Sequence, residues 1–285
     1  WLSSLKIYSL TMRKKIPNID RHKNQHGVAL FVVIVFVMLS MLLALWASRT
    51  SLFNEMFVFN DADYQRAFEA AQALIQDAEL DIRGENADGT ACSSANCREK
   101  QAGVPQIPLE TQEVTPLLTS LDLQETKCLR GLCTKRTGRQ DFWNYTNSTN
   151  PTPSNLVPGE VTLEKMTQAT VGARYGQYTG ALQGMLEGSN PKPANPILMW
   201  DGSTPANQGG WYWIEIMPYD QSSSSSGVIV RPATAKTTDL LSLNLSPNVA
   251  YRITAVAFGR KRDSANNPLT MAVLQQTYVR QVLKD

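Results

Sequence analysis

The chain has 285 residues, 42% hydrophobic and 18% charged, and its 27 basic and 25 acidic residues give a formal charge of +2. The basic excess lies in residues 1–27, which hold six basic residues and one acid, so the remainder has 21 basic and 24 acidic residues, a charge of −3. Nucleic-acid binding therefore has no electrostatic support outside this leader. The only histidines, His22 and His26, also lie in the leader. The rest of the chain lacks the base of Ser-His-Asp and Cys-His sites, and no sequence pattern indicates an enzyme, a cofactor or a metal.

An apolar run at residues 28–47 is the first predicted element. It holds 20 residues, and Ser40 is its only polar member. A helix of this length spans about 30 Å, which matches the hydrocarbon core of a bilayer, whereas the apolar core of a secretory signal peptide has about 7–15 residues. The run therefore favours a retained membrane span. The pair Ala47-Ser48 imitates a signal-peptide cleavage site, so a secretory signal stays open as the alternative.

Charge gives the run a direction across the membrane. Basic flanks stay in the cytoplasm, so we expect residues 1–27 inside and the chain after residue 47 outside. Trp46 lies near the far end of the run, where an interfacial aromatic residue is expected. Met12 begins a short basic leader, and we expect it to be the start of translation, with residues 1–11 as upstream translated sequence.

A single long helix is predicted over residues 28–83, because neither Gly nor Pro occurs there. After the apolar run the pattern becomes amphipathic, with polar residues such as Asp77 and Asp81 between the members of an apolar stripe. The stripe recurs at steps of four and three residues and consists of Tyr64, Phe68, Ala71, Ile75, Ala78 and Ile82. It is short and rich in alanine, which favours packing on a sheet over a coiled coil. Gly84 is expected to end the helix, and the capping residues Asn60–Asp63 leave a break there as an alternative.

Four cysteines lie in a loop-rich region predicted over residues 84–158, and they form two C-x4-C pairs, Cys92 with Cys97 and Cys128 with Cys133. Four thiolates could hold zinc, but outside a membrane disulfides are favoured. Three connectivities are possible. Gly131 lies in the short loop of the second pair and favours local pairing there, and by analogy in the first pair. Small disulfide loops stabilise less than long ones, so these bonds are expected to shape loops.

Residues 159–285 carry the strand signals, and we expect them to form the sheet of a periplasmic globular domain. Alternating aromatic and aliphatic residues at 211–219 predict one strand, and residues 248–260 and 269–283 predict an antiparallel hairpin. Residues 196–200 favour a further short strand. A long helix followed by an antiparallel sheet of about four strands is an α+β fold.

Four aromatic residues near the clearest strand are candidates for recognising a surface or a sugar, and they are Trp200, Trp211, Tyr212 and Trp213. The competing interpretation is that alternate members form sheet core, because successive side chains of a strand point to opposite faces. The sequence favours this second interpretation.

The N-terminal region resembles that of type IV prepilins. Its features are a basic leader, Gly27, an apolar helix directly after the glycine, and an amphipathic continuation. More closely, HGVALFVVIVFVMLSML (residues 26–42) and AFEAAQAL (residues 67–74) resemble the N-terminal helix of PilX-type minor pilins. The resemblance covers residues 27–83, with weaker matches in YRITAVAFG and LQQTYVR near the C-terminus. It implies a type IV pilin-like fold, in which the long helix packs on a C-terminal antiparallel sheet.

The resemblance also implies how the chain is processed. The chain would insert once into the inner membrane, with its N-terminus in the cytoplasm and its C-terminal domain in the periplasm. A prepilin peptidase would cut between Gly27 and Val28 and methylate the new amino group, and residues 28–47 would later enter the core of a pilus. Most pilins carry glutamate at the fifth mature position, which is Val32 here. This departure argues against a role as a subunit that repeats along the pilus shaft.

The implied function is that of a minor pilin, a structural subunit that helps to prime pilus assembly at the tip. The implied partners are other minor pilins, the major pilin, a PilY-type tip adhesin and the prepilin peptidase. Two alternatives stay open: a pseudopilin of a type II secretion system, and an adhesive binding module displayed on the pilus. A membrane-anchored enzyme finds no support, because the sequence carries no nucleophile elbow, phosphate loop or metal motif.

Overall fold

The structure is a computed structural model, and it describes residues 26–86, 88–136, 139–145, 159–179, 195–218 and 249–280. The leader up to residue 25, with Met12, lies outside the described residues, as do residues 87, 137–138 and 146–158 of the predicted loop-rich region and the last residues of the predicted 269–283 strand. Internal contacts divide the chain into two compact units, residues 1–56 and residues 57–285, and each is described by itself.

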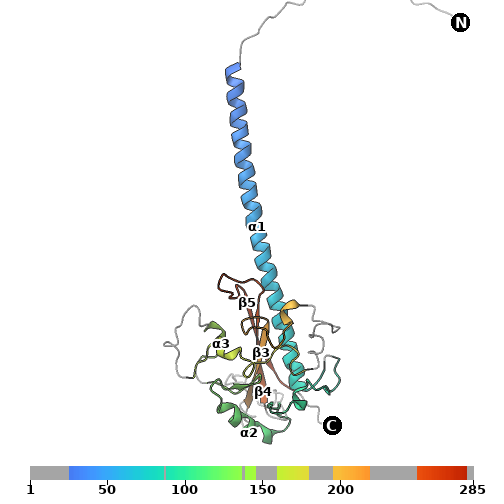
Figure 1. The fold of residues 1–285 in the computed structure, drawn as a ribbon. Coiled ribbons are helices and arrows are strands. Elements are labelled where there is room, and N and C mark those ends of the chain that lie inside the picture. Colours follow the sequence, from blue (N-terminus) through green and yellow to red (C-terminus); the bar gives the residue numbers. More distant parts are fainter. Residues whose placement is uncertain are drawn as a thin grey trace, which may run out of the picture. The chain divides into compact units, whose positions relative to one another are not determined.

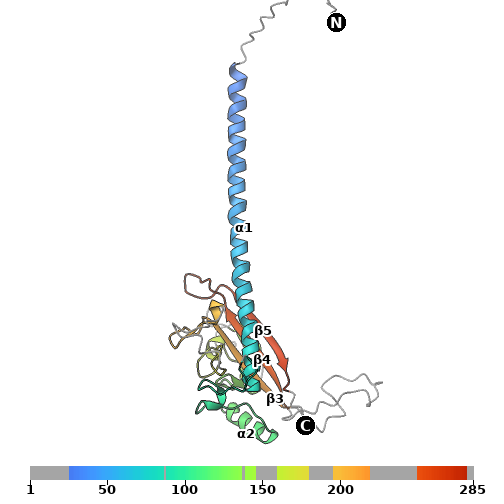
Figure 2. The ribbon, with the colours of Figure 1, turned by 90° about the vertical axis from the view of Figure 1, so that its right-hand side faces the viewer.

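α1 (His26–Arg83) is one uninterrupted helix of 58 residues (Figures 1 and 2). This confirms the predicted helix, and the alternative of a break at Asn60–Asp63 is wrong. The helix ends at Gly84, which adopts a φ of 68° that favours glycine. The backbone N–H of Gly84 donates to the carbonyl of Asp81 at 3.2 Å, so the end of α1 is capped from within the chain.

The sheet of the 57–285 unit has five strands among the described residues, in the order β1-β2-β3-β4-β5. Their bounds are β1 Cys128–Leu129, β2 Leu132–Cys133, β3 Gly210–Pro218, β4 Val249–Phe258 and β5 Met271–Tyr278. All neighbours pair antiparallel except β2 and β3, which are parallel. The strands predicted at 211–219, 248–260 and 269–283 correspond to β3, β4 and β5. The expected pilin-like α+β fold is confirmed, with two short strands that the sequence did not predict.

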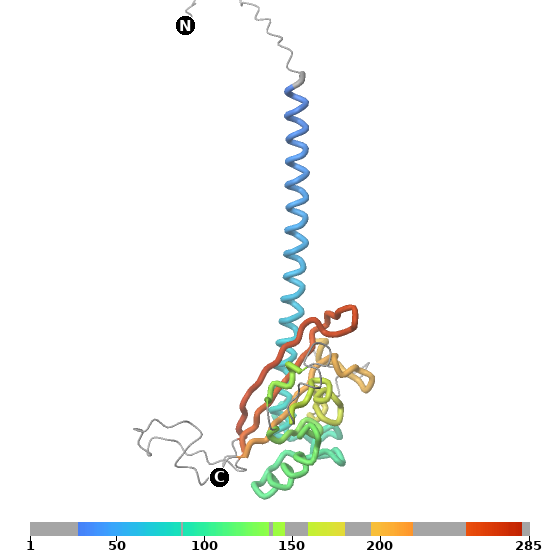
Figure 3. The backbone as a smooth tube through the Cα atoms, turned by 90° about the vertical axis from the view of Figure 1, so that its left-hand side faces the viewer, coloured from blue at the N-terminus to red at the C-terminus, as the bar shows by residue number. Residues whose placement is uncertain are grey.

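Both faces of this sheet are covered. The side chains of Tyr212 and Ile214 share one core with α1, while Trp211 and Trp213 share a second core with α3 (Leu163–Met166). Figure 3 shows α1 on one side of the strands and the shorter elements on the other. This is why β3 is apolar along nearly its whole length: a strand buried on two faces needs apolar residues at every position.

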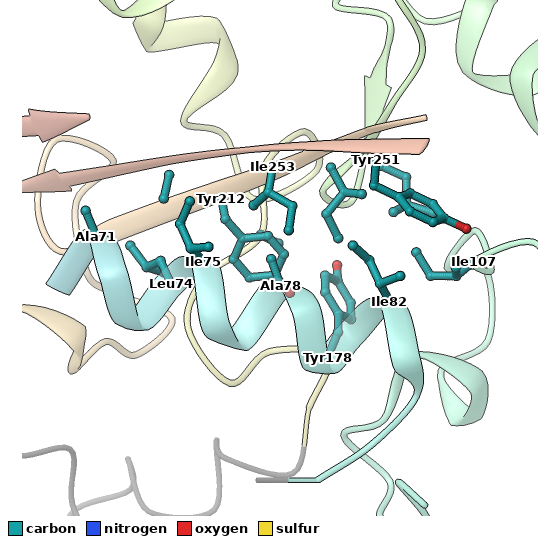
Figure 4. Packing of buried hydrophobic residues seen from close by; sticks show 14 of the residues in the cluster. Ala71, Leu74, Ile75, Ala78, Ile82, Ile107, Tyr178, Tyr212, Tyr251 and Ile253 are labelled. Carbon is teal, nitrogen blue, oxygen red and sulfur yellow. The ribbon is translucent and has the colours of Figure 1, made fainter. Parts of the chain in front are cut away.

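α1 packs on the sheet through more residues than the predicted stripe (Figure 4). Ala71, Ile75, Ala78 and Ile82 are buried as expected, and Phe68 is partly buried, but Tyr64 is 46% exposed. Further residues of α1 are fully buried, namely Ala67, Ala70 and Leu74. The helix lies so close to β3 that a side chain at Gly210 would collide with the side chain of Leu74. The alanines on this face allow that approach.

One prediction about the connecting segments is wrong, and one helix in them was not predicted. The predicted loop region contains α2 (Thr111–Asp122), whose first turn is held by Glu113, because the Glu113 carboxylate accepts hydrogen bonds from the backbone of Leu109 at 2.8 Å and Glu110 at 3.2 Å. Residues 196–200 contain a 3-10 helix, η5 (Pro196–Leu198), in place of a strand. Proline at its first position suits a helical turn and withholds a strand donor. Two further short helices are η1 (Arg98–Lys100) and η2 (Phe142–Asn144).

Candidate assembly interface

The first half of α1 presents apolar side chains on all sides. From Val28 to Trp46 every large apolar side chain is exposed, from 37% for Val35 to 71% for Trp46. The hydroxyl of Ser40 donates to the carbonyl of Val37 at 2.8 Å, so the one polar side chain of the run has a partner inside the helix. Length and composition qualify this part of α1 as a candidate membrane span, and none of its most apolar stretch is buried within the described chain.

The start of α1 carries no acidic group. Gly27 and Val28, the predicted processing pair, lie in its first turn, and the side chain of Val28 is 68% exposed. Val32 takes the position where most pilins carry glutamate, and it is exposed too. No Asp or Glu occurs in the sequence from Val28 up to Glu55. This end of the helix can therefore make apolar contacts but cannot pair with a cation.

The second half of α1 is fixed to the globular domain at three carboxylates. At the first of them, Asp63 accepts hydrogen bonds from the backbone N–H groups of Arg260 at 2.9 Å and Lys261 at 3.4 Å, and from the hydroxyl of Thr270. Burial raises the pKa of Asp63, but these hydrogen bonds outweigh it and hold the pKa below its ordinary value. A side chain at Gly259 would collide with Asp63 and Thr270. The β4–β5 turn is thereby held against α1.

The second carboxylate, Asp81, forms a buried ion pair with Arg98. The two nitrogens Nε and Nη2 of Arg98 donate to the two oxygens of Asp81 at 2.7 and 2.6 Å, and the side chains are 3% and 0% exposed. The hydroxyl of Tyr212 donates to the same carboxylate at 3.0 Å. Burial alone would lower the pKa of Arg98, but the charge of Asp81 raises it above its ordinary value. Arg98 also donates to the carbonyl of Arg130 at 3.1 Å, so it joins α1 to the β1–β2 hairpin.

The third carboxylate, Asp77, is buried without a cation. It accepts hydrogen bonds from the backbone N–H of Gly176 at 2.7 Å and from the hydroxyl of Thr179 at 2.5 Å, and no ion pair between described residues includes it. Burial, helped by the charge of Asp81 one turn away, raises the pKa of Asp77 to about 7. The sequence pattern placed Asp77 and Asp81 between the members of the apolar stripe, and the structure adds that both side chains are buried. The sequence held one signal of this burial, because each aspartate is directly followed by a member of the stripe, Ala78 or Ile82.

The cysteines form the local disulfides Cys92–Cys97 and Cys128–Cys133, the pairs that the sequence favoured. The second disulfide joins directly opposed residues of β1 and β2. Gly131 in their turn has a φ of 87°, and a side chain there would lie 2.7 Å from the side chain of Ala173. The described residues contain no group of three or more His, Cys, Asp or Glu that could hold a metal ion.

The interpretation of the four aromatic residues as a binding surface needs correction. Trp211, Tyr212 and Trp213 are at most 2% exposed, because both faces of β3 are covered. The indole N–H of Trp211 donates to the carbonyl of Ala206 at 2.9 Å, and that of Trp213 donates to the carbonyl of Met166 at 3.2 Å. Trp200 alone of the four is half-buried, and it lines a hollow of about 280 Å³ beside Arg174 and Asp201.

Comparison with known proteins gives one match. The model of the family described as type IV pilus assembly protein PilX, C-terminal part, matches residues 129–280, which are 152 of the 285 residues. No curated protein and no solved structure matches the chain. The matched residues begin in β1 and end two residues after β5, whereas the resemblance seen in the sequence rests mainly on residues 27–83. Two separate parts of the chain thus lead to the same conclusion, and the chain belongs to the PilX family of type IV pilus assembly proteins.

Proposed function

We propose that this PilX-family protein is a minor pilin that primes pilus assembly and stays at or near the tip. Residues 28–47 anchor it in the inner membrane, and the 57–285 unit lies in the periplasm. Its partners are other minor pilins, the major pilin and a PilY-type tip protein. The observation that carries this proposal is the uncharged start of α1, where Val32 and its neighbours offer no carboxylate.

The physical argument concerns the amino group that processing creates. In a filament whose helices pack together, the charged amino group of each subunit is buried and needs a carboxylate from its neighbour. A chain without an acid from Val28 to Asn54 cannot supply that carboxylate. Stacking copies of this chain would leave a buried, unpaired charge at every step. A single copy with no subunit ahead of it leaves none, which favours the tip.

The test is the number of copies per pilus. Sheared and purified pili are analysed by quantitative mass spectrometry, with the major pilin as the reference. We expect this chain at trace level, and deletion of its gene should sharply reduce the number of pili. An amount comparable with that of the major pilin would overturn the proposal.

A matched pair of substitutions sharpens the argument. Val32→Glu restores the carboxylate at the fifth mature position, while Val33→Glu puts the same charge one residue away. We expect only Val32→Glu to raise the amount of this chain in purified pili. An equal effect of both substitutions, or of neither, would show that the missing carboxylate does not determine the place of the subunit.

Processing is tested by intact mass and N-terminal sequencing of the membrane-extracted protein, with and without the prepilin peptidase. We expect a mature chain that begins at N-methylated Val28 only when the peptidase is present. A chain that begins after Ala47 would instead indicate a cleaved secretory signal.

An adhesive role is a second candidate, and the hollow beside Trp200 favours it. The ring of Trp200 is fixed, because its indole N–H donates to the carbonyl of Tyr175 at 2.7 Å. Polar groups of Asp201 and Thr204 line the same hollow. If this hollow binds a surface sugar, Trp200→Ala should reduce attachment of piliated cells while leaving the number of pili unchanged. Leu123→Ala, at an exposed residue that directly follows α2, serves as the control, and equal attachment by both variants would remove this candidate.

A further inference from the structure

The sheet has two edges, and they differ in length and in how they are covered. The edge strand β1 has two residues, and the turn that follows it is tied to a neighbouring loop, because the N–H of Arg130 donates to the carbonyl of Thr170 at 2.8 Å. The opposite edge strand, β5, has eight residues. Figure 2 shows β5 as the outermost strand, beside α1. The edge with room for a further strand is therefore that of β5.

The free edge of β5 presents a row of backbone hydrogen-bonding groups. All eight residues pair with β4 in one continuous register, from Met271 opposite Phe258 to Tyr278 opposite Tyr251. In an antiparallel pair, alternate residues turn their N–H and C=O groups away from the neighbouring strand. Among the described residues, none outside β4 hydrogen-bonds to the backbone of β5. The outward groups of β5 are thus open to another backbone.

β5 also lacks the features by which proteins protect such an edge. These features are charged side chains, proline, and a bulge that twists the strand away. The sequence MAVLQQTY of residues 271–278 has no charged residue and no proline, and the continuous register leaves no bulge. Gln275, Gln276 and Thr277 are exposed. A long, exposed and uncharged edge is the kind of surface on which an extended peptide adds a strand.

α1 runs alongside this edge in the same direction as β5. At one end Asp63 accepts a hydrogen bond from the hydroxyl of Thr270, which directly precedes β5. At the other end the side-chain amide of Gln276 donates to the carboxylate of Glu79 at 2.6 Å. These contacts are about 24 Å apart along the helix and about 20 Å apart along the strand, so helix and strand lie close to parallel.

Two partly buried apolar side chains lie on the α1 side of the edge. Phe68 precedes Glu79 by about three turns of α1, so its side chain points to the same side of the helix, toward β5. Leu274 of β5 packs against the same core as Phe68, and neither residue is fully buried. A strand added beside β5 would cover the exposed parts of both side chains.

We propose that the edge of β5 pairs with an extended segment of a partner protein, which adds a further strand to the sheet. A regular row of backbone donors and acceptors is best matched by another extended backbone. The segment carries no charge where it pairs, because β5 offers no charge to compensate it, and it places an apolar residue beside Phe68 and Leu274. This inference adds an interaction surface to the proposed function and does not depend on the place of the chain in the pilus.

A second copy of this chain fits the edge less well. Because α1 is parallel to β5, two β5 strands paired antiparallel would point residues 57–83 of the two copies in opposite directions. Two β5 strands paired in parallel would put these helical segments on opposite faces of the joined sheet. Neither arrangement lets the long helices of two copies lie side by side in one direction, which favours a different protein as the partner.

Photo-crosslinking in piliated cells tests this inference. In three separate variants of the full chain, p-benzoylphenylalanine replaces Gln275, Thr277 or, as the control, Leu123, which directly follows α2 and is 82% exposed. Mass spectrometry maps the crosslinked residues. Gln275 and Thr277 lie on the same face of β5, because they are two residues apart. We expect both to crosslink to one partner, at positions two residues apart in its sequence, and Leu123 not to reach that segment.

The other outcomes would overturn the inference. A lack of adducts at both Gln275 and Thr277 would show that no strand occupies the edge. Partner residues that do not shift by two would indicate a contact other than strand pairing. Adducts within one chain would show an edge covered from within, and adducts between tagged and untagged copies would show pairing with a second copy. The copy number of the chain in pili does not enter this test, so failure of the proposed function is distinguishable.

A matched pair of double variants tests the edge itself. Gln275→Lys with Thr277→Lys puts two charges on β5, and Gln112→Lys with Thr115→Lys puts the same charges on exposed positions of α2. Lysine protects an edge, because strand pairing would bring its charge against the added strand. With p-benzoylphenylalanine at Gln276, the β5 variant should lose most of its adducts and the α2 variant should keep them. Equal yields from the two double variants would contradict pairing at this edge.

Discussion

The two halves of α1 form one continuous helix but are built for different surroundings. From Val28 to Trp46 the helix is apolar on every side and has no carboxylate. From Asp63 to Ile82 it buries one face against a sheet, and that face includes three carboxylates, each with hydrogen-bond donors. A helix can thus bury acids where a folded domain supplies partners, whereas a segment made for lipid or for a bundle of helices excludes them.

The largest expected effect comes from breaking the Asp81–Arg98 pair. Arg98→Met leaves the carboxylate of Asp81 buried without its cation, and we expect a loss of about 3–5 kcal/mol in the free energy of unfolding. Urea unfolding of the detergent-solubilised chain, followed by near-ultraviolet circular dichroism, measures it. Combining Arg98→Met with Asp81→Leu should recover part of the loss. A double variant that is less stable than Arg98→Met would argue against the pair as the cause.

The next largest effect on stability is expected at Leu74, and it compares the two halves of α1 directly. Leu74 is fully buried against the sheet, while Leu45 is 56% exposed in the apolar run. Leu74→Ala should destabilise the domain by about 2–5 kcal/mol, because it removes buried methyl groups and leaves a cavity. Leu45→Ala should leave the same unfolding transition unchanged. If both substitutions shift the transition equally, the exposed half contributes to the stability of the domain and the contrast between the halves is wrong.

Asp77 makes the free energy of unfolding depend on pH, and the direction of that dependence follows from its pKa. Its pKa is about 7 in the folded chain and 3.8 as the ordinary value, so between these values the folded state binds more protons than the unfolded state. Stability should therefore fall as pH rises from about 4 to 7, by on the order of 2–4 kcal/mol.

The check is unfolding at several pH values, with Asp77→Asn as the comparison, because asparagine does not titrate and should lack this decline. Asp63 does not interfere in this range. Its pKa is lowered, so the stability that it contributes is lost only as pH falls below its ordinary value of 3.8. An unchanged slope in Asp77→Asn would assign the decline to another group.

The smallest effect is expected at Tyr64. The sequence placed it in the apolar stripe, but it is 46% exposed, and its contact is the ring of Phe68 at a centroid distance of 6.5 Å. Tyr64→Ala should change the free energy of unfolding by less than about 0.5 kcal/mol. A larger loss would mean that the buried face of α1 extends one turn further than the structure has it.

Features that depend on neighbouring residues in the sequence could be predicted well. α1 follows from the lack of Gly and Pro and from the apolar period, and β3 to β5 follow from their alternation and turn. α2 was missed because Pro116 inside it and its many polar residues argue against a helix, and the capping residue Glu113 was the signal that could have revealed it.

Features that depend on distant partners could not be predicted. The burial of Asp81 follows from Arg98, 17 residues away, and from Tyr212, 131 residues away. That of Asp77 follows from Gly176 and Thr179. The helical period of α1 contains no information about these donors. The sequence predicted only alternate members of Trp211, Tyr212 and Trp213 as core, whereas all three are buried. This could not be predicted, because the sequence does not reveal the layer that covers the second face of the sheet.

The three attachments of α1 have a mechanical consequence. Asp63, Asp77 and Asp81 are spread over 18 residues, about 27 Å along the helix axis. A pull on the N-terminal end of α1, along its axis, loads these attachments in shear, so that they resist together and do not open one after another. Tension applied to the helix is therefore distributed over several parts of the globular domain at once, namely the β4–β5 turn, the loop at Gly176 and Thr179, and β3 through Tyr212.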